Sequence, residues 1–111
     1  MSGVVQHREL ARGRWFELSL AEQLGNIGGE VHRMRTAGDQ RRGDFLAAFQ
    51  RALELIDLTL RDPRHRERLK EITRLREILC DTVSGSAAYR TTLEDLDGYL
   101  LQFAVAARLH R

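Results

Sequence analysis

The chain has 111 residues, 42% hydrophobic and 31% charged, a balance typical of one folded domain and opposed to wholesale disorder. Eighteen lysines and arginines narrowly outnumber sixteen acidic residues, so a net charge of +2 gives little support to nucleic-acid binding. The sequence has no apolar run of membrane-spanning length and no secretory signal, and its lone Cys80 fits a reducing compartment, so we expect a cytoplasmic protein.

The first main helix is predicted to begin after Ser19, because Ser19 and Glu22 have the spacing of a capping box. The helix should end near Ala37 and Gly38, where glycine permits a left-handed cap. Spacings of three and four residues place one apolar stripe on its inner face, made of Leu20, Leu24, Ile27, Val31 and Met34.

Three further helices follow in the apolar pattern. The second is predicted from about Arg41 to Leu60, and Asp62-Pro63 stops it. Its inward face is predicted to consist of Leu46, Phe49, Leu53, Ile56 and Leu60. The third should start with Pro63 in its first turn and end at residues 84–86. The fourth should begin at residues 91–94, which form a second capping-box pattern, with Leu93, Leu96, Leu100, Phe103 and Ala107 facing inward.

Short connections between helices of similar length favour antiparallel neighbours. We therefore predict an all-α fold, an antiparallel up-down four-helix bundle with a short N-terminal appendage. Residues 1–14 would form a tail or short helix, and residues 15–111 the bundle domain, with Trp15 and Phe16 pinning the appendage to it.

The first helix contains three glycines, Gly25, Gly28 and Gly29, each of which costs about 1 kcal/mol relative to alanine. Close packing of another helix and a break in the helix are the two explanations, and we expect close packing. On the same helix Glu22, Gln23, Asn26 and Glu30 share a flank. They are interpreted as a buried hydrogen-bond network that fixes helix register, with a ligand site as the alternative.

Two helices carry more apolar surface than one core needs. On the second, Leu55 and Leu58 fall roughly opposite Leu53 at about 100° per residue. On the fourth, Leu101, Val105 and Leu109 form a separate line beside the inner one. Either the N-terminal segment covers this surface, or it is an interface between copies of the chain. We predict a homo-oligomer interface at these five residues, since large exposed apolar patches are uncommon on monomers.

The most conspicuous polar feature is a basic stretch at the start of the third helix, and its candidate nucleic-acid contacts are Arg61, Arg64, Arg66, Arg68 and Lys70. Interleaved acidic residues such as Glu67 and Glu71 could instead pair with them locally, and no aromatic residue is present to stack on bases. A salt-bridged surface is the favoured interpretation.

No motif in the sequence indicates chemistry. The four histidines are scattered without ligand spacing, Cys80 lies in an apolar pattern typical of core packing, and no glycine-rich phosphate loop follows a strand. We expect no catalytic residue, no metal, no cofactor and no small-molecule substrate.

Residues 15–31, with the sequence WFELSLAEQLGNIGGEV, resemble the N-terminal signature of a family of small uncharacterised bacterial helical proteins. The runs RALELIDLT at 51–59 and RLREILCD at 74–81 also resemble that family, which implies no particular activity. In architecture alone the chain is similar to the four-helix-bundle accessory proteins of diversity-generating retroelements, whose ring-like oligomers engage nucleic acid and a reverse transcriptase. The functional expectation is a non-enzymatic assembly or adaptor protein that self-associates and binds a macromolecular partner. The alternative is a nucleic-acid-binding accessory protein that uses the arginine-rich helix face.

Overall fold

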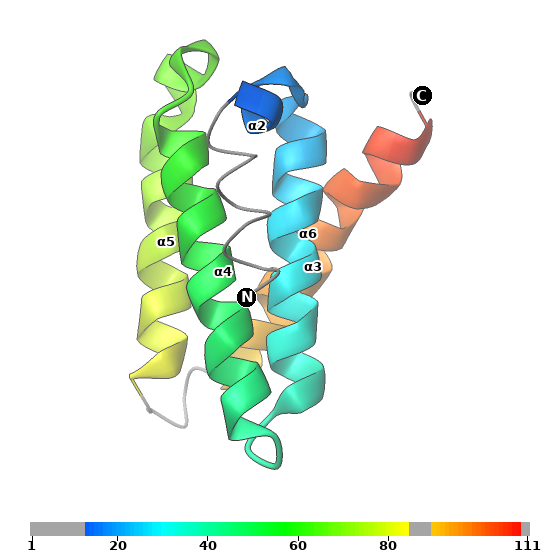
Figure 1. The fold of residues 1–111 in the computed structure, drawn as a ribbon, viewed down its shortest axis with the longest axis vertical. Helices are drawn as coiled ribbons and strands as arrows, with labels where there is room; N and C mark the ends of the chain where they lie inside the picture. Colours follow the sequence, from blue (N-terminus) through cyan, green and yellow to red (C-terminus); the bar gives the residue numbers. More distant parts are fainter. Residues whose placement is uncertain (1–12, 85–89, 110–111) are drawn as a thin grey trace.

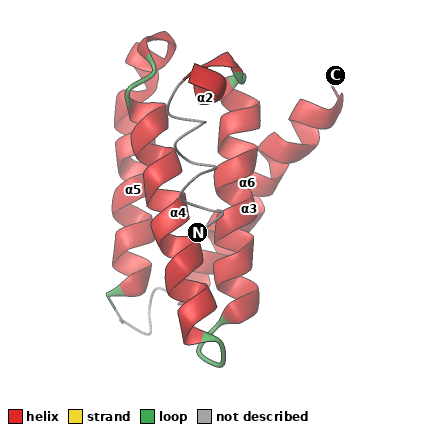
Figure 2. Ribbon diagram, viewed as in Figure 1, coloured by secondary structure: helices red, strands yellow, loops and turns green. Residues whose placement is uncertain are grey.

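The computed structural model describes residues 13–84 and 90–109. In this part of the chain every regular element is helical and no strand occurs (Figure 2), which confirms the predicted all-α class and its four long helices. The elements are α2 (Trp15–Glu17), α3 (Leu20–Ala37), α4 (Arg42–Leu60), the 3-10 segment η2 (Pro63–Arg68), α5 (Leu69–Val83) and α6 (Arg90–Leu109). The predicted tail at residues 1–14 falls almost wholly outside the described residues.

The ends of α3 lie where its sequence places them. The Ser19 hydroxyl accepts a hydrogen bond from the backbone N–H of Glu22 at 3.1 Å, and the Glu22 carboxylate accepts one from the Ser19 N–H at 3.0 Å. At the other end Gly38 has φ of 55°, a conformation that a side chain would strain, and its N–H closes the helix on the Met34 carbonyl. The predicted capping box and glycine stop of this helix are therefore confirmed.

The chain enters α5 through a different conformation from the one predicted. Pro63 does begin a helical segment, but residues 63–68 form a 3-10 helix in which His65 leaves helical geometry, with φ −105° and ψ 24°. Regular α-helix starts only at Leu69. At the start of this segment the buried Asp62 carboxylate accepts a hydrogen bond from the Arg64 N–H at 3.0 Å, and the His65 N–H donates to the Asp62 carbonyl at 3.1 Å, the three-residue spacing of a 3-10 turn.

In space, α3, α4 and α5 lie side by side, while α6 crosses α3 obliquely and its C-terminal end lies apart from α4 and α5 (Figure 1). Most of the packing of α6 is against α3. The short α2 contacts α4, and the Trp15 side chain is buried there, as the prediction that Trp15 pins this segment requires.

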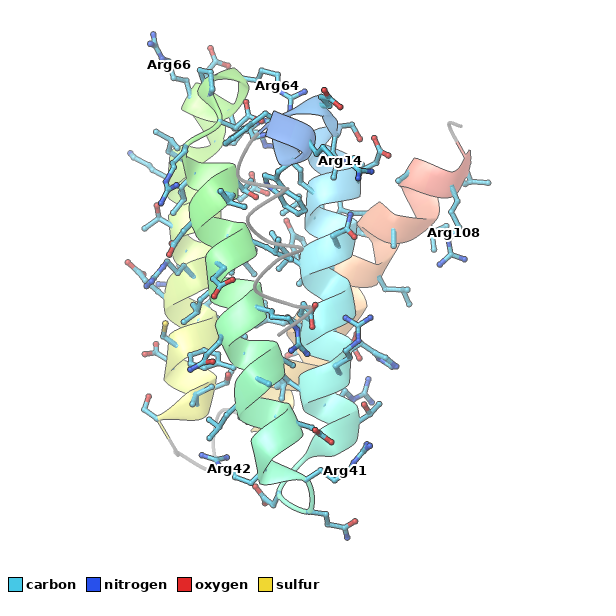
Figure 3. The ribbon with its side chains drawn as sticks, viewed as in Figure 1. Arg14, Arg41, Arg42, Arg64, Arg66 and Arg108 are labelled. Atoms are coloured by element: carbon cyan, nitrogen blue, oxygen red, sulfur yellow. The ribbon has the colours of Figure 1, made fainter. Side chains whose placement is uncertain are left out.

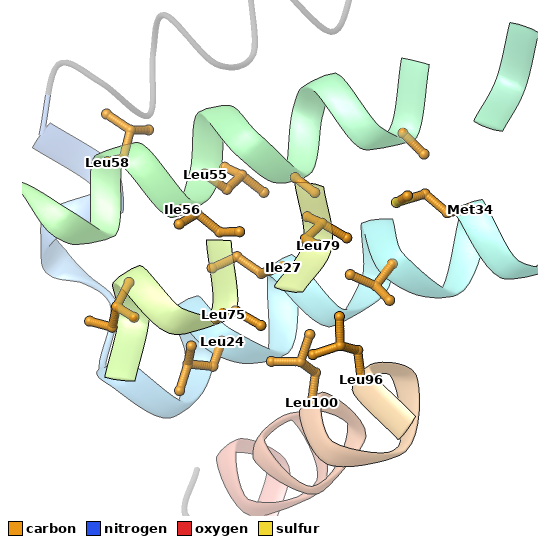
Figure 4. Close-up of a cluster of buried hydrophobic side chains, with 14 of the residues drawn as sticks. Leu24, Ile27, Met34, Leu55, Ile56, Leu58, Leu75, Leu79, Leu96 and Leu100 are labelled. Carbon is orange, nitrogen blue, oxygen red and sulfur yellow. The ribbon is translucent and has the colours of Figure 1, made fainter. Parts of the chain in front are cut away.

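The core is filled by leucine, isoleucine, valine and methionine from all four long helices (Figure 4). The predicted stripe of α3 is buried at Leu24, Ile27, Val31 and Met34, and on α6 the buried apolar side chains among the described residues are Leu96 and Leu100. One helix face was misplaced. On α4 the buried face includes Phe45, Ala48, Ala52, Leu55, Ile56 and Leu58, whereas Leu46, predicted to face inward, is 39% exposed.

Candidate interaction surface on α6

A line of apolar side chains on α6 is open to solvent. Leu101 is 56% exposed, Val105 45% and Leu109 76%, and their spacing of four residues keeps them on one side of the helix. The opposite side carries Leu96 and Leu100, which are buried against the other helices. The second apolar line that the sequence predicts on this helix therefore lies outside the core of the single chain. We call Leu101, Val105 and Leu109 the α6 stripe.

Two glycines of α3 allow α6 to pack closely against this helix. A β-carbon built on Gly25 would lie 2.9 Å from the Ala104 Cα, and one built on Gly28 would lie 2.8 Å from the Leu100 Cβ. These positions have no room for a side chain, which confirms the prediction of close helix packing for Gly25 and Gly28. Gly29 is different, because the nearest atom to a β-carbon added there would be the Arg33 Nη1, at 3.9 Å.

Two shallow grooves flank this crossing of α3 and α6. The larger has a volume of about 390 Å³ and runs past Gly29 and Gly98 to Leu101 and Arg108. The smaller, about 320 Å³, lies toward Leu18 and also reaches Arg108. The larger groove therefore borders the α6 stripe directly, so that an apolar ridge and a hollow lie next to each other on one face.

One end of the larger groove contains a buried carboxylate. Asp97 of α6 is 7% exposed and lies 3.0 Å from both the His32 Nδ1 and the Arg35 Nη1 of α3. Burial opposes the charge of Asp97, but the hydrogen bonds with His32 and Arg35 outweigh it and lower the pKa of the carboxyl group. These contacts fix α6 to α3 near the point where the α6 stripe begins.

The prediction that Leu55 and Leu58 of α4 belong to the interface is wrong. Leu55 is 4% exposed and Leu58 is 6% exposed, so both are core residues of the single chain. The single inward stripe assumed for α4 was too narrow, because this helix contacts α3, α5, α2 and η2 and needs apolar surface on several sides. The predicted surface is therefore reduced to the α6 stripe.

The predicted basic stretch, called the basic ridge below, contains cations with and without a carboxylate partner among the described residues: Arg61, Arg64, Arg66, Arg68 and Lys70. Arg64 is held by Asp62, with 2.6 Å between its Nη2 and the Asp62 Oδ2, and also donates to the Leu18 carbonyl. Arg68 pairs with Glu71 at 3.1 Å. Arg61, Arg66 and Lys70 are exposed and form no ion pair with another described residue.

The arginines at the connection between α3 and α4 lie far from the basic ridge. Arg41 and Arg42 are at one end of the molecule, and Arg64 and Arg66 are at the other (Figure 3). The two basic clusters therefore do not merge into one continuous patch.

Behind Arg64 lies a buried polar cluster that joins α2, α3, α4 and η2. The Gln23 amide nitrogen donates to the Trp15 carbonyl at 2.9 Å and to the Asp62 carboxylate at 3.1 Å. Its amide oxygen lies 2.7 Å from the His65 Nε2, which must therefore carry a hydrogen. The Trp15 indole N–H donates to the Thr59 hydroxyl at 3.0 Å. Gln23 and Thr59 are completely buried, so the cluster fixes the register of four elements.

The charge states in this cluster are set by its contacts. The Arg64 guanidinium beside Asp62 holds the pKa of that carboxyl well below its usual range, although burial opposes the effect. Burial lowers the pKa of His65, against the attraction of Asp62. The stable arrangement is an ionised Asp62 paired with Arg64 and a neutral His65.

The polar residues of α3 that were predicted to form one buried network make separate contacts instead. Gln23 belongs to the buried cluster, whereas Glu30 pairs with Arg33 at 3.0 Å and with Arg51 at 3.1 Å. Asn26 is exposed and donates to the Glu22 carbonyl. The sequence pattern did not reveal the partners Thr59 and Asp62, because Asp62 was interpreted only as a helix stop. The pair of charged residues directly before Pro63, Arg61 and Asp62, was the available signal.

Neither a cluster of metal ligands nor a membrane-spanning helix occurs among the described residues. Within residues 13–84 and 90–109 no three histidine, cysteine or acidic side chains come together as metal ligands. No helix in this part of the chain combines the length and apolar character needed to cross a bilayer. Cys80 is partly buried, and the Arg76 guanidinium lies 3.9 Å from its sulfur.

Comparison with known proteins gives no match for this chain: no family model, no curated protein and no solved structure matches it.

Proposed function

We propose that this chain is a non-enzymatic assembly or adaptor protein that self-associates through the α6 stripe and binds a macromolecular partner with the surface that remains. The observation that carries this proposal is the exposure of Leu101, Val105 and Leu109 on one side of α6. Leaving three neighbouring large apolar side chains in water forgoes roughly 1.5–3 kcal/mol for each one that an interface could bury fully. The resemblances in the sequence are compatible with such a role.

The proposed architecture behind this function is an up-down antiparallel four-helix bundle in the cytoplasm. In such a bundle the first three long helices would cover one another, and α6, which packs mainly on α3, would keep a side free. That free side is where the α6 stripe lies, beside a groove of about 390 Å³.

The test is the mass of the particle in solution for two matched variants. Leu101→Glu places a charge on the α6 stripe, and Leu46→Glu places the same charge on α4, where the leucine is also exposed. We expect the wild type and Leu46→Glu to form the same oligomer in size-exclusion chromatography with light scattering, and Leu101→Glu to shift toward the monomer. Equal masses for both variants, with helical content unchanged, would contradict the proposal.

A second candidate function is nucleic-acid binding at the η2 end. The observation in its favour is that Arg61, Arg66 and Lys70 are exposed and unpaired among the described residues, while Arg64 and Arg68 have carboxylate partners. Three cations make a weak site, which repetition around an oligomer would strengthen.

This second function has its own test. Fluorescence anisotropy with a single-stranded RNA oligonucleotide should show binding that weakens with salt and is lost in an Arg61→Glu/Arg66→Glu double variant. Arg41→Glu/Arg42→Glu, at the other end of the molecule, should bind normally. Binding that ignores ionic strength would exclude a phosphate-contacting ridge.

A further inference from the structure

A regular pattern of residues runs along the exposed side of α6. Glu94, Gly98, Leu101, Val105 and Arg108 follow one another at spacings of four, three, four and three residues, and all five are exposed. This is the spacing of a helix face that pairs with another helix along a seam. Neither Glu94 nor Arg108 has an ion-pair partner among the described residues, so both ends of the seam are free to pair.

The pattern complements itself when a second copy of the helix runs in the opposite direction. With the two-fold axis at Leu101, Glu94 and Arg108 lie seven residues to either side of it, so each Glu94 meets the Arg108 of the other copy. Gly98 then lies within one residue of the position opposite Val105, and Leu101 meets its own counterpart. A parallel pair would instead place Glu94 beside Glu94 and Arg108 beside Arg108. Charge and size therefore select the antiparallel arrangement.

The groove beside the seam gives independent support. Gly29 and Gly98 both line it, and nothing within the described chain forces either residue to be glycine: Gly98 has no atom within 4 Å of a built β-carbon, and Gly29 has one at 3.9 Å. Gly25 and Gly28, by contrast, are required by α6 itself. Interior helical glycines are unfavourable relative to alanine, and a helix from outside that packs closely here would explain these two.

We infer that a second copy of this chain occupies this face, with its α6 antiparallel to α6 of the first copy and seated beside the Gly29–Gly98 groove. The inference rests on the proposed self-association and adds its partner, register and symmetry. The contact is isologous, since the same patch serves both copies, so assembly through this face closes at two chains. The two Glu94–Arg108 pairs fix the direction, and the apolar residues between them supply most of the affinity.

The first experiment exchanges the charges. Glu94→Arg and Arg108→Glu each turn two attractive contacts per dimer into repulsive ones, and each should raise the dimer dissociation constant about tenfold in sedimentation equilibrium at low salt. The double variant Glu94→Arg/Arg108→Glu restores both pairs and should return to within about threefold of the wild type. Glu77→Arg, a reversal on the exposed surface of α5, is the matched control and should leave dimerisation unchanged.

The second experiment reports the register by cross-linking, in a Cys80→Ala background that removes the native thiol. Leu101→Cys should form a disulfide-linked dimer under mild oxidation, because the two copies meet at this residue. Leu109→Cys should not, because eight residues on each side of the axis separate the two thiols by about 24 Å along the helices. A parallel pair would cross-link at both positions and would overturn the inference.

The outcomes separate this inference from the proposed function. A chain that stays monomeric at all concentrations contradicts both. A dimer that Leu101→Glu dissociates, but that is indifferent to charge exchange and cross-links at Leu109, keeps the proposed function and refutes the antiparallel seam. Restoration by the double variant, together with cross-linking at Leu101 alone, is the result expected.

Discussion

Because α3 and α6 cross closely at Gly25, replacing this glycine with alanine should lower the free energy of unfolding, although alanine has the higher helix propensity. Alanine in place of Gly25 should favour an isolated helix by about 1 kcal/mol. In the folded chain its β-carbon would lie 2.9 Å from the Ala104 Cα and 3.1 Å from the Ala104 nitrogen, and these backbone atoms cannot rotate away. Overpacking of this kind costs about 1–3 kcal/mol. The free energy of unfolding should therefore fall by up to about 2 kcal/mol.

The matched control is Gly98→Ala, where nothing lies within 4 Å of the new methyl group and the free energy of unfolding should rise by about 1 kcal/mol. Both variants belong in a Leu101→Glu background, which removes self-association from the comparison. Urea unfolding followed by the fluorescence of Trp15, the only tryptophan and a buried one, measures both. Equal stabilisation by the two substitutions would refute the close approach of α6 to α3.

Three further predictions concern the core and the buried cluster. Leu58→Ala should lower the free energy of unfolding by about 2–5 kcal/mol, whereas Leu109→Ala should change it by less than about 0.5 kcal/mol in urea titrations of the monomer. Asp62→Asn should cost about 1.5–3 kcal/mol in thermal unfolding because it removes a buried acceptor of Arg64, and the more exposed Asp57→Asn should cost less than about 1 kcal/mol. Because the pKa of His65 is lowered, the folded state takes up a proton at His65 less readily than the unfolded chain does. The free energy of unfolding should therefore fall as the pH drops below about 6.5. His65→Gln should reduce this pH dependence in urea midpoints measured across the same range.

Much of the helix layout could be predicted because its signals are local. The capping box at Ser19 and Glu22, the glycine after Ala37 and the proline at position 63 each act within a few residues, and the structure ends its helices at or near them. The glycines of α3 also predicted that another helix packs closely against this one. Their cost in a helix requires a compensating contact, and at Gly25 and Gly28 that contact is α6.

The face of α4 could not be predicted in the same way, because it depends on how many neighbours the helix has. Leu55 and Leu58 looked surplus only on the assumption of a single inward stripe, and the contacts of α4 with α2, α3, α5 and η2 bury them. The partners of the buried cluster were missed for a similar reason. Gln23 and Asp62 are 39 residues apart, and their hydrogen bond exists only once α3 and the end of α4 are side by side.

Self-association is tested most directly by the solution mass of the unmodified chain, measured by light scattering after size exclusion over a range of concentrations. Burial of the α6 stripe between copies predicts a particle of at least twice the 12.8 kDa chain mass that dissociates on dilution. A species that stays at 12.8 kDa at every concentration would contradict it.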